Sequence, residues 1–286
     1  MGHWYDQEGN PRHEVRGKNG MRSTTLRDAR KSGWIPSVST VWSDVVSKPM
    51  LTRWKENNLM TAMHNVANAW WVEHMKGVLQ PLPDEDDSDI ESNIRLAREA
   101  FSLHQKGLTD RGINAHQSLA IYFNSLGEDV VDLGDHALMI RNVVAKLDQL
   151  CGKQEWESEK SFAHSHGYGG QVDLCSDEFV IDFKTKDMSK GADVKKMVFD
   201  DHGVQLAAYD TGLGDSGRRL INLYIDVESG TVLEWEHEDT ERYWNMFKCA
   251  LELWKLIKKY DPKWYSEIGP KENGLSSLQY SKRKIV

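Results

Sequence analysis

The chain has few cysteines and no long apolar run. Its three cysteines, Cys151, Cys175 and Cys249, lie far apart among 286 residues. This spacing argues against a disulfide framework and indicates a reducing cytoplasm. No apolar stretch approaches the roughly 20 residues that a membrane-spanning helix needs, and the first 15 residues are too polar for a signal peptide. The sequence therefore predicts a cytoplasmic protein without a membrane partner.

The chain also lacks an overall positive charge. The formal net charge is −8, which argues against binding nucleic acid through general basicity. The basic residues instead gather near the N-terminus, where residues 12–31 carry seven of them against two acidic ones. Acidic residues concentrate in residues 84–91. A basic segment on an acidic body is compatible with a phosphate-binding surface, and the alternative is a solvated, flexible arm.

The composition is that of a globular protein with a core, at 39% hydrophobic and 28% charged residues. Residues 1–33 show no periodicity and are interpreted as a basic N-terminal arm. Residues 34–262 are predicted to form a single domain, with a helical section over 34–150 and a sheet core with a closing helix over 151–262. The Ser- and Lys-rich residues 263–286 are predicted to be loosely held.

Apolar residues recur every three to four positions through most of the helical section. The pattern predicts helices over 50–76, from Ser88 or Ser92 to Gly107, from Thr109 to Phe123, and over 135–150. The third of these should turn Ile113, His116, Ala120 and Phe123 inward.

The second half alternates between strand and helix patterns. We expect strands over 155–163, 171–175, 179–184, 219–227 and 231–236, a helical stretch over 194–213 broken near residue 202, and a closing helix from about residue 240. The predicted fold class is α/β, with a small mixed central sheet flanked by helices.

The predicted hairpin over 171–184 brings charged residues together. If Asp177 and Glu178 form the turn, Asp173 pairs directly with Asp182. Residues directly opposite in a hairpin share a face, with Cβ atoms about 5 Å apart. Asp182 and Lys184 also share a face, because they lie two apart in one strand. Two facing carboxylates repel unless a cation offsets them.

Two carboxylates and a lysine on one face suit metal-assisted phosphodiester hydrolysis. The carboxylates would hold Mg²⁺ or Mn²⁺ through hard oxygen ligands, and the lysine would position the attacking water or stabilise developing negative charge. The alternative for Asp182 and Lys184 is a solvent-facing ion pair on an edge strand.

The order of these residues resembles the PD-(D/E)XK nuclease superfamily, and more narrowly its RecB-like exonuclease branch. The resemblance begins with Gly170-x-x-Asp173 and Asp182-x-Lys184. Four further features occur in the expected order: Pro36–Thr40 with Leu51-x-x-Trp54, Gly112-x-x-x-His116, Glu159, and Gln205-x-x-x-Tyr209. Each motif is weak alone, and their order from about residue 36 to 210 carries the resemblance.

The resemblance implies a restriction-endonuclease-like core and assigns roles to these residues. Asp173, Asp182 and Lys184 would be catalytic, and His116 would join the two aspartates as a metal ligand. Glu159 would position water or a ligand, or would be an exposed strand residue. Gln205 and Tyr209 would contact Lys184 or DNA, or would pack on the sheet. Lys186 would add a phosphate contact, or would be solvated.

The implied activity is a Mg²⁺- or Mn²⁺-dependent exonuclease acting on single-stranded or duplex DNA ends. Phage-type recombination, replication or DNA degradation are its implied settings, with a recombination or single-strand-binding protein as partner and the host cytoplasm as compartment. The alternatives are a structure-specific endonuclease and an inactive DNA-binding module on the same fold. The chain departs from relatives that hold an iron–sulfur cluster, since it lacks four clustered cysteines. It also lacks a Walker A motif, so no helicase motor is predicted.

Overall fold

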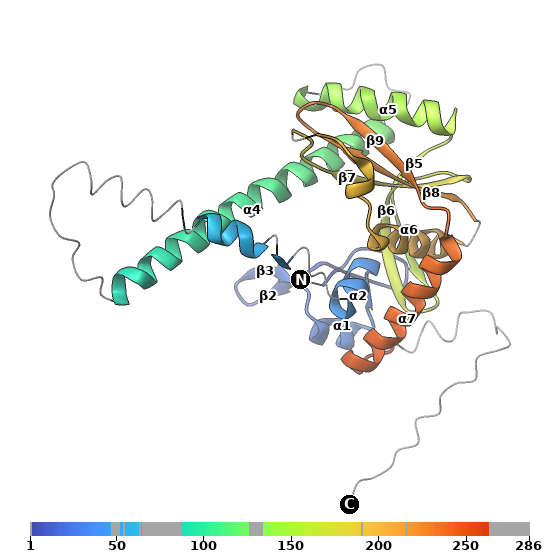
Figure 1. Ribbon diagram of the computed structural model, residues 1–286. Coiled ribbons are helices and arrows are strands. Elements are labelled where there is room, and N and C mark those ends of the chain that lie inside the picture. Colours follow the sequence, from blue (N-terminus) through green and yellow to red (C-terminus); the bar gives the residue numbers. More distant parts are fainter. Residues whose placement is uncertain are drawn as a thin grey trace, which may run out of the picture.

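The computed structural model describes residues 2–46, 52–53, 55–62, 64, 87–125, 134–189, 191–214 and 217–262. Much of the helix predicted over 50–76, and the predicted tail over 263–286, lie outside these residues. Within them, the chain is a mixed α/β protein built on a five-stranded sheet flanked by helices (Figure 1).

The central sheet has the strand order β5-β6-β7-β8-β9. Its strands are β5 (Glu157–His164), β6 (Tyr168–Cys175), β7 (Phe179–Thr185), β8 (Arg219–Ile225) and β9 (Val232–Glu236). Only the β7–β8 pair is parallel. The chain between β7 and β8 forms the short helix η2 (Val194–Lys196) and α6 (Asp200–Gly212). The prediction of a small mixed sheet is confirmed.

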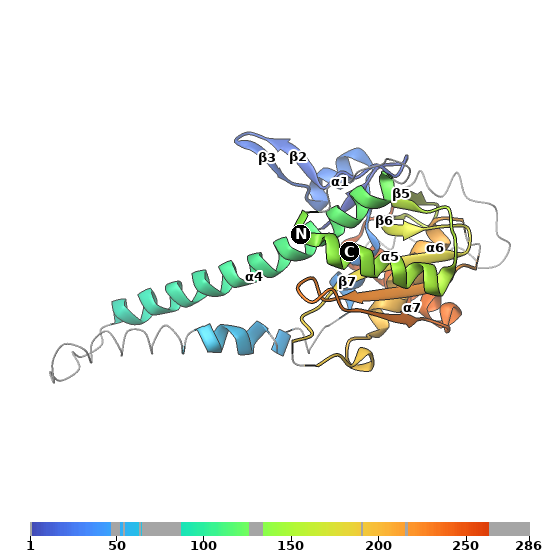
Figure 2. The ribbon, with the colours of Figure 1, turned by 90° about the horizontal axis from the view of Figure 1, so that it is seen from above.

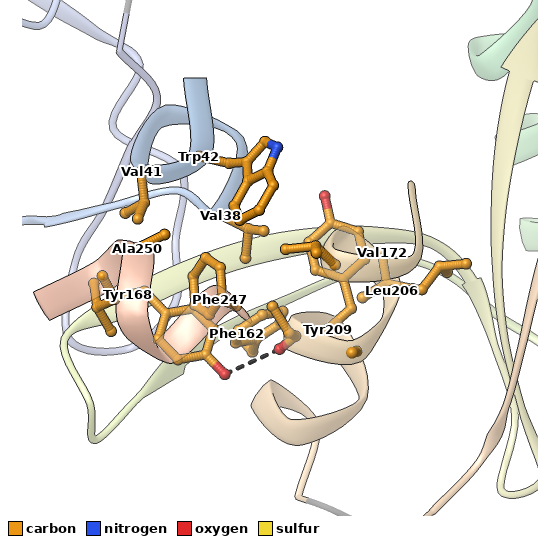
Figure 3. Packing of buried hydrophobic residues seen from close by; sticks show 14 of the residues in the cluster. Val38, Val41, Trp42, Phe162, Tyr168, Val172, Leu206, Tyr209, Phe247 and Ala250 are labelled. Carbon is orange, nitrogen blue, oxygen red and sulfur yellow. Dashed lines mark hydrogen bonds between the residues drawn. The ribbon is translucent and has the colours of Figure 1, made fainter. Parts of the chain in front are cut away.

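Helices cover both faces of the sheet, so its middle strand is buried from both sides. On one face, α4 (Asp87–Asn124) and α5 (Ala137–Cys151, preceded by the 3₁₀ turn η1, Gly134–His136) pack over Phe179, Ile181 and Phe183. On the other, α2 (Val38–Val45), α6 and α7 (Thr240–Lys258) pack over Val172 and Val180 (Figure 3). This burial explains why β7 is apolar along most of its length, with Asp182 as an exception.

The N-terminal segment is part of the folded unit, which corrects the expectation of a loose arm over residues 1–33. Strand β1 (Trp4–Tyr5) pairs with β4 (Ile35–Pro36), and β2 (Glu14–Gly17) forms a hairpin with β3 (Gly20–Ser23). Helix α1 (Leu26–Ser32) follows, capped by Thr25. Trp4, Tyr5 and Ala29 are buried. These strands are two to four residues long, too short for a periodic pattern to appear in the sequence.

Helix α4 is continuous, where the sequence predicted two helices separated at Gly107. Glycine in a helix interior costs only about 1 kcal/mol relative to alanine, so it need not end a helix. The 38 residues of α4 span about 57 Å, and the helix extends well beyond the sheet (Figure 2). In the C-terminal part of α4, Ala115, Leu119 and Phe123 are buried, whereas Ile113 is 49% exposed. The predicted inward stripe was therefore wrong at Ile113.

The remaining helices follow the predicted pattern with shifted ends. Ser37 caps α2, and its hydroxyl oxygen accepts a hydrogen bond from the backbone N–H of Thr40. Helix α6 runs through residues 202 and 203 without the predicted break. In α7, Phe247, Leu251 and Trp254 are buried, whereas Ile257 is exposed. No helix in the described parts of the chain is both long and apolar enough to span a membrane.

Candidate functional site

Strands β6 and β7 pair through only part of their length. The predicted register holds at Cys175 with Val180 and at Leu174 with Ile181, and it ends there. Asp173 and Asp182 are not paired through the backbone, which corrects the expectation of direct cross-strand neighbours. Instead, the Asp173 carboxylate accepts a hydrogen bond from the backbone N–H of Phe183 at 2.8 Å. The carboxylate thus takes a place in the ladder that a backbone carbonyl would otherwise fill.

Asp182 is 3% exposed, and both of its carboxylate oxygens are contacted by donors. Oδ1 accepts from Lys184 Nζ at 3.0 Å and from Gln205 Nε2 at 2.9 Å. Oδ2 lies 2.7 Å from Lys184 Nζ and accepts from Asn222 Nδ2 at 2.6 Å. A buried carboxylate is costly unless it is paired and hydrogen-bonded, and this one is held from β7, β8 and α6 together. The solvent-facing ion pair considered from the sequence is therefore excluded.

Gln205 and Tyr209 on α6 continue this network. Lys184 Nζ donates to Gln205 Oε1 at 3.0 Å, and Gln205 Nε2 also donates to the Tyr209 hydroxyl at 2.9 Å. The spacing of four residues places both side chains on one face of the helix, as predicted. The ring of Tyr209 packs against Gly170, where a Cβ atom would lie 2.8 Å from it. Gly170 thus allows α6 and its tyrosine to approach the sheet.

His116 reaches the same region from α4 on the other face of the sheet. Its Nδ1 lies 3.4 Å from Asp173 Oδ2, and its ring stands edge-on to Phe183. One turn earlier, a Cβ on Gly112 would lie 3.1 Å from the Thr185 hydroxyl. The glycine therefore lets α4 pass close to the end of β7, which brings His116 within reach of Asp173.

Glu159 and Lys186 lie at the margin of the network. Glu159 sits between two residue pairs of the β5–β6 ladder, Ser158 with Leu174 and Lys160 with Val172, and so lies across from Asp173. Its backbone has a φ of 55°, which is unusual for a non-glycine residue and marks local strain. Lys186 is anchored by its backbone N–H to Ile225, and its side chain makes no contact with the two aspartates among the described residues.

The electrostatics of the site favour additional positive charge. Burial raises the pKa of Asp182 and of Glu159, and the Asp173 charge raises both further. Burial works in the opposite direction on His116 and Lys184, yet the pKa of each is raised, because Asp173 acts on His116 and Asp182 acts on Lys184. All four shifts favour the form with one more proton. Clusters of groups with perturbed pKa values are common at functional sites.

The donor types match a divalent cation. Carboxylate oxygens suit Mg²⁺ and Mn²⁺, and Asp173, Asp182 and His116 are the residues that would hold such an ion. Among the described residues, no three His, Cys, Asp or Glu side chains are gathered closely enough to hold one in the present arrangement. The four acceptor positions of the Asp182 carboxylate are taken by Lys184, Gln205 and Asn222. Metal binding at Asp182 therefore requires Lys184 to release at least one oxygen.

Asn222 and His237 form a buried support that sequence reasoning missed. Asn222, 0% exposed, lies beside Asp182 in the parallel β7–β8 ladder. Its amide nitrogen donates to Asp182, so its oxygen is the acceptor for His237 Nε2 at 2.8 Å. His237 must then be the Nε2–H tautomer, and burial lowers its pKa to about 4. The available signal was an amide side chain within the otherwise apolar and aromatic run of residues 220–225.

Comparisons with known proteins do not assign the chain to a family. No profile of a known protein family matches the chain, and no curated protein matches it. Among solved structures, the crystal structure of SSO0001 is similar over 40% of this chain and 56% of that chain, at 20% identity and a TM-score of 0.26. The chain thus spans a little over half the length of that neighbour, and a likeness of this size carries no argument about fold or activity.

Proposed function

We propose that the protein is a metal-dependent deoxyribonuclease of the PD-(D/E)XK type that hydrolyses phosphodiester bonds at DNA ends. The observation that carries the proposal is the convergence of Asp173, Asp182, Lys184 and Gln205 where β6 and β7 separate. The sequence motifs identified the same residues as candidates without any knowledge of these hydrogen bonds. A restriction-endonuclease-like core, Mg²⁺ or Mn²⁺ as cofactor, DNA as substrate and the cytoplasm as compartment are parts of the same proposal.

The described side chains can be assigned distinct tasks in that reaction. Lys184 bridges Asp182 and Gln205, so its ammonium is held where it can stabilise negative charge on a phosphoryl oxygen. Gln205 orients the Lys184 ammonium, and Asn222 holds the Asp182 carboxylate in place through a hydrogen bond from the neighbouring strand β8. A bound divalent ion would supply activation of water and neutralisation of phosphate charge.

An inactive DNA-binding module is the second candidate, and one observation favours it. Lys184 contacts both oxygens of Asp182, so the ammonium group neutralises the buried carboxylate without a metal ion. A protein of this kind needs no metal and shows salt-dependent DNA binding alone.

Digestion of labelled DNA separates these functions. Linear single-stranded, linear duplex and circular single-stranded DNA are incubated with Mg²⁺, with Mn²⁺ or with EDTA, and the products are resolved by size. We expect linear DNA to be degraded from an end only with metal, while the circle stays intact. Cleavage of the circle indicates an endonuclease. Binding without cleavage under every metal condition overturns the proposal and supports the binding module.

A further inference from the structure

A pocket of about 190 Å³ lies beside Gln205, between α6, α2 and the N-terminal segment. Gln205 and Asp201 line it from α6, and Ser39, Thr40 and Trp42 line it from α2. Gln205 is also the side chain that contacts Lys184 and Asp182. A group that occupies the pocket and touches Gln205 is therefore one side chain away from the candidate catalytic residues.

The charges around the pocket argue against an anionic occupant. Among the described residues that line it, none is Lys or Arg, and Asp201 contributes a carboxylate. His3 also lines the pocket, and burial together with the charge of the N-terminus lowers its pKa, so it is neutral at pH 7. The Gln205 amide is already engaged by Lys184, Asp182 and Tyr209, and the Thr40 hydroxyl by His3 and Ser37. The remaining polar groups of the lining are the Ser39 and Ser43 hydroxyls and the Asp201 carboxylate. Such a set suits a neutral ligand that has both hydrogen-bond donors and acceptors.

Trp42 adds an aromatic side chain to the lining of the pocket. The residue is 8% exposed, and its ring packs in the cluster with Val38 and Phe247 (Figure 3). Figure 3 shows the indole nitrogen at the end of the ring that lies away from Val38. An aromatic side chain beside polar groups suits a heteroaromatic ligand.

The volume sets the size of the occupant. A cavity of about 150 Å³ holds one benzene molecule, so 190 Å³ is enough room for a single heterocycle. Within a nucleotide, the neutral heteroaromatic part is the base. Resting on the nuclease function proposed above, we propose that this pocket holds one unpaired nucleobase next to the phosphodiester at Asp182 and Lys184. The substrate class is then a DNA end whose last bases are unpaired.

Single-stranded oligonucleotides with and without terminal bases test the pocket. One oligonucleotide is intact, a second lacks the last two bases at both ends, and a third lacks two bases in its middle. Their dissociation constants are measured by fluorescence anisotropy in Ca²⁺ without Mg²⁺. We expect native protein to bind the oligonucleotide with abasic ends about tenfold more weakly than the other two, the size of effect reported for one base contact.

Two variants show whether the pocket causes that difference. Ser43 is an exposed α2 residue that lines the pocket, so Ser43→Leu fills it without disturbing the core. Asn245→Leu places the same side chain at an exposed position of α7. We expect Ser43→Leu to bind all three oligonucleotides with equally weakened affinity, and Asn245→Leu to match the native protein.

The outcomes separate the pocket from the nuclease proposal. If native protein binds the intact oligonucleotide and the one with abasic ends equally well, the proposal that the pocket holds a nucleobase is overturned. It is also overturned if the tenfold difference between these two oligonucleotides persists in Ser43→Leu. In either case, metal-dependent cleavage of linear DNA leaves the nuclease proposal standing. Native protein that neither binds nor cleaves any of the oligonucleotides overturns both.

Discussion

Asp182–Lys184 and Asp210–Arg218 are both ion pairs with mostly buried side chains, yet their surroundings differ. Arg218 Nη1 lies 3.1 Å from Asp210 Oδ1 on α6, and Arg218 Nε donates a hydrogen bond to the backbone oxygen of Ser176, before β7, at 2.8 Å. It thereby ties a turn to the end of a helix. Asp182–Lys184, in contrast, lies within electrostatic reach of Asp173 and His116.

The difference shows that burial of an ion pair does not by itself mark a functional site. Removing one partner of a buried pair is costly in either place, so both pairs have a structural reason to exist. Only the Asp182–Lys184 pair is accompanied by raised pKa values on neighbouring Glu159 and His116. What distinguishes the candidate site is a group of titratable side chains with raised pKa values around its ion pair, and the following predictions test this distinction.

The largest expected effect is on catalysis by Lys184→Met. The substitution removes the ammonium that contacts Asp182 and Gln205, and loss of such a group lowers rates by about 10²- to 10⁴-fold. Removing one partner of a buried pair also lowers stability, but Asp182 keeps its bonds from Gln205 and Asn222, so we expect a folded fraction to which the rates can be normalised. Initial rates on end-labelled DNA and a circular dichroism spectrum provide the check. A rate within twofold of native in the folded variant contradicts the assigned role.

Arg218→Met should reverse this pattern. The variant leaves the Asp210 carboxylate and the Ser176 carbonyl without their guanidinium partner, and breaking a buried pair costs about 3–5 kcal/mol. Urea unfolding followed by tryptophan fluorescence measures the loss. Activity per folded molecule should match the native value. A large loss of activity at unchanged stability would place Arg218 in the functional machinery instead.

Asn222→Ala should show an intermediate effect with a pH signature. Loss of such a supporting contact typically costs 10- to 100-fold in metal affinity or activity. Burial raises the Asp182 pKa, and losing the bond from Asn222 raises it further, because that bond favours the charged carboxylate. The reaction needs Asp182 ionised, so the acidic limb of the pH–rate profile should move to higher pH. An unmoved limb with reduced activity indicates a merely structural role.

The smallest expected effect is that of Tyr209→Phe. It removes a hydroxyl that accepts a bond from Gln205 and keeps the ring that packs against Gly170. A single neutral hydrogen bond contributes about 0.5–1.5 kcal/mol, so the unfolding free energy should fall by no more than that, and the rate should fall about two- to tenfold. Phe162→Leu, which alters ring packing on Tyr209 without touching the network, serves as the matched control for packing.

The sequence predicted the hairpin and its charged end because strand periodicity and a short turn together determine the register. Cys175 and Val180 pair as expected for that reason. The separation of the strands beyond Leu174 was not predictable from periodicity. It depends on the Asp173 side chain bonding to the Phe183 backbone, a local contact that competes with the ladder.

The contacts made by α4 and β8 were harder to predict for a related reason. Helix α4 has apolar residues on several sides, so only packing against the sheet selects Leu119 over Ile113 as buried. Asn222 was missed because its role is to hydrogen-bond Asp182, which lies beside it in the parallel strand β7. Partners 40 residues apart leave no pattern in a single sequence.

We attribute the proposed metal-dependent cleavage to the residues gathered where β6 and β7 separate, and not to burial of charge in general. The most direct measurement compares release of an end label from linear DNA with Mg²⁺ by native protein, Lys184→Met and Arg218→Met, each normalised to folded protein. The account predicts release by native protein and Arg218→Met, and none by Lys184→Met. Equal release by all three, or release unchanged by EDTA, would contradict it.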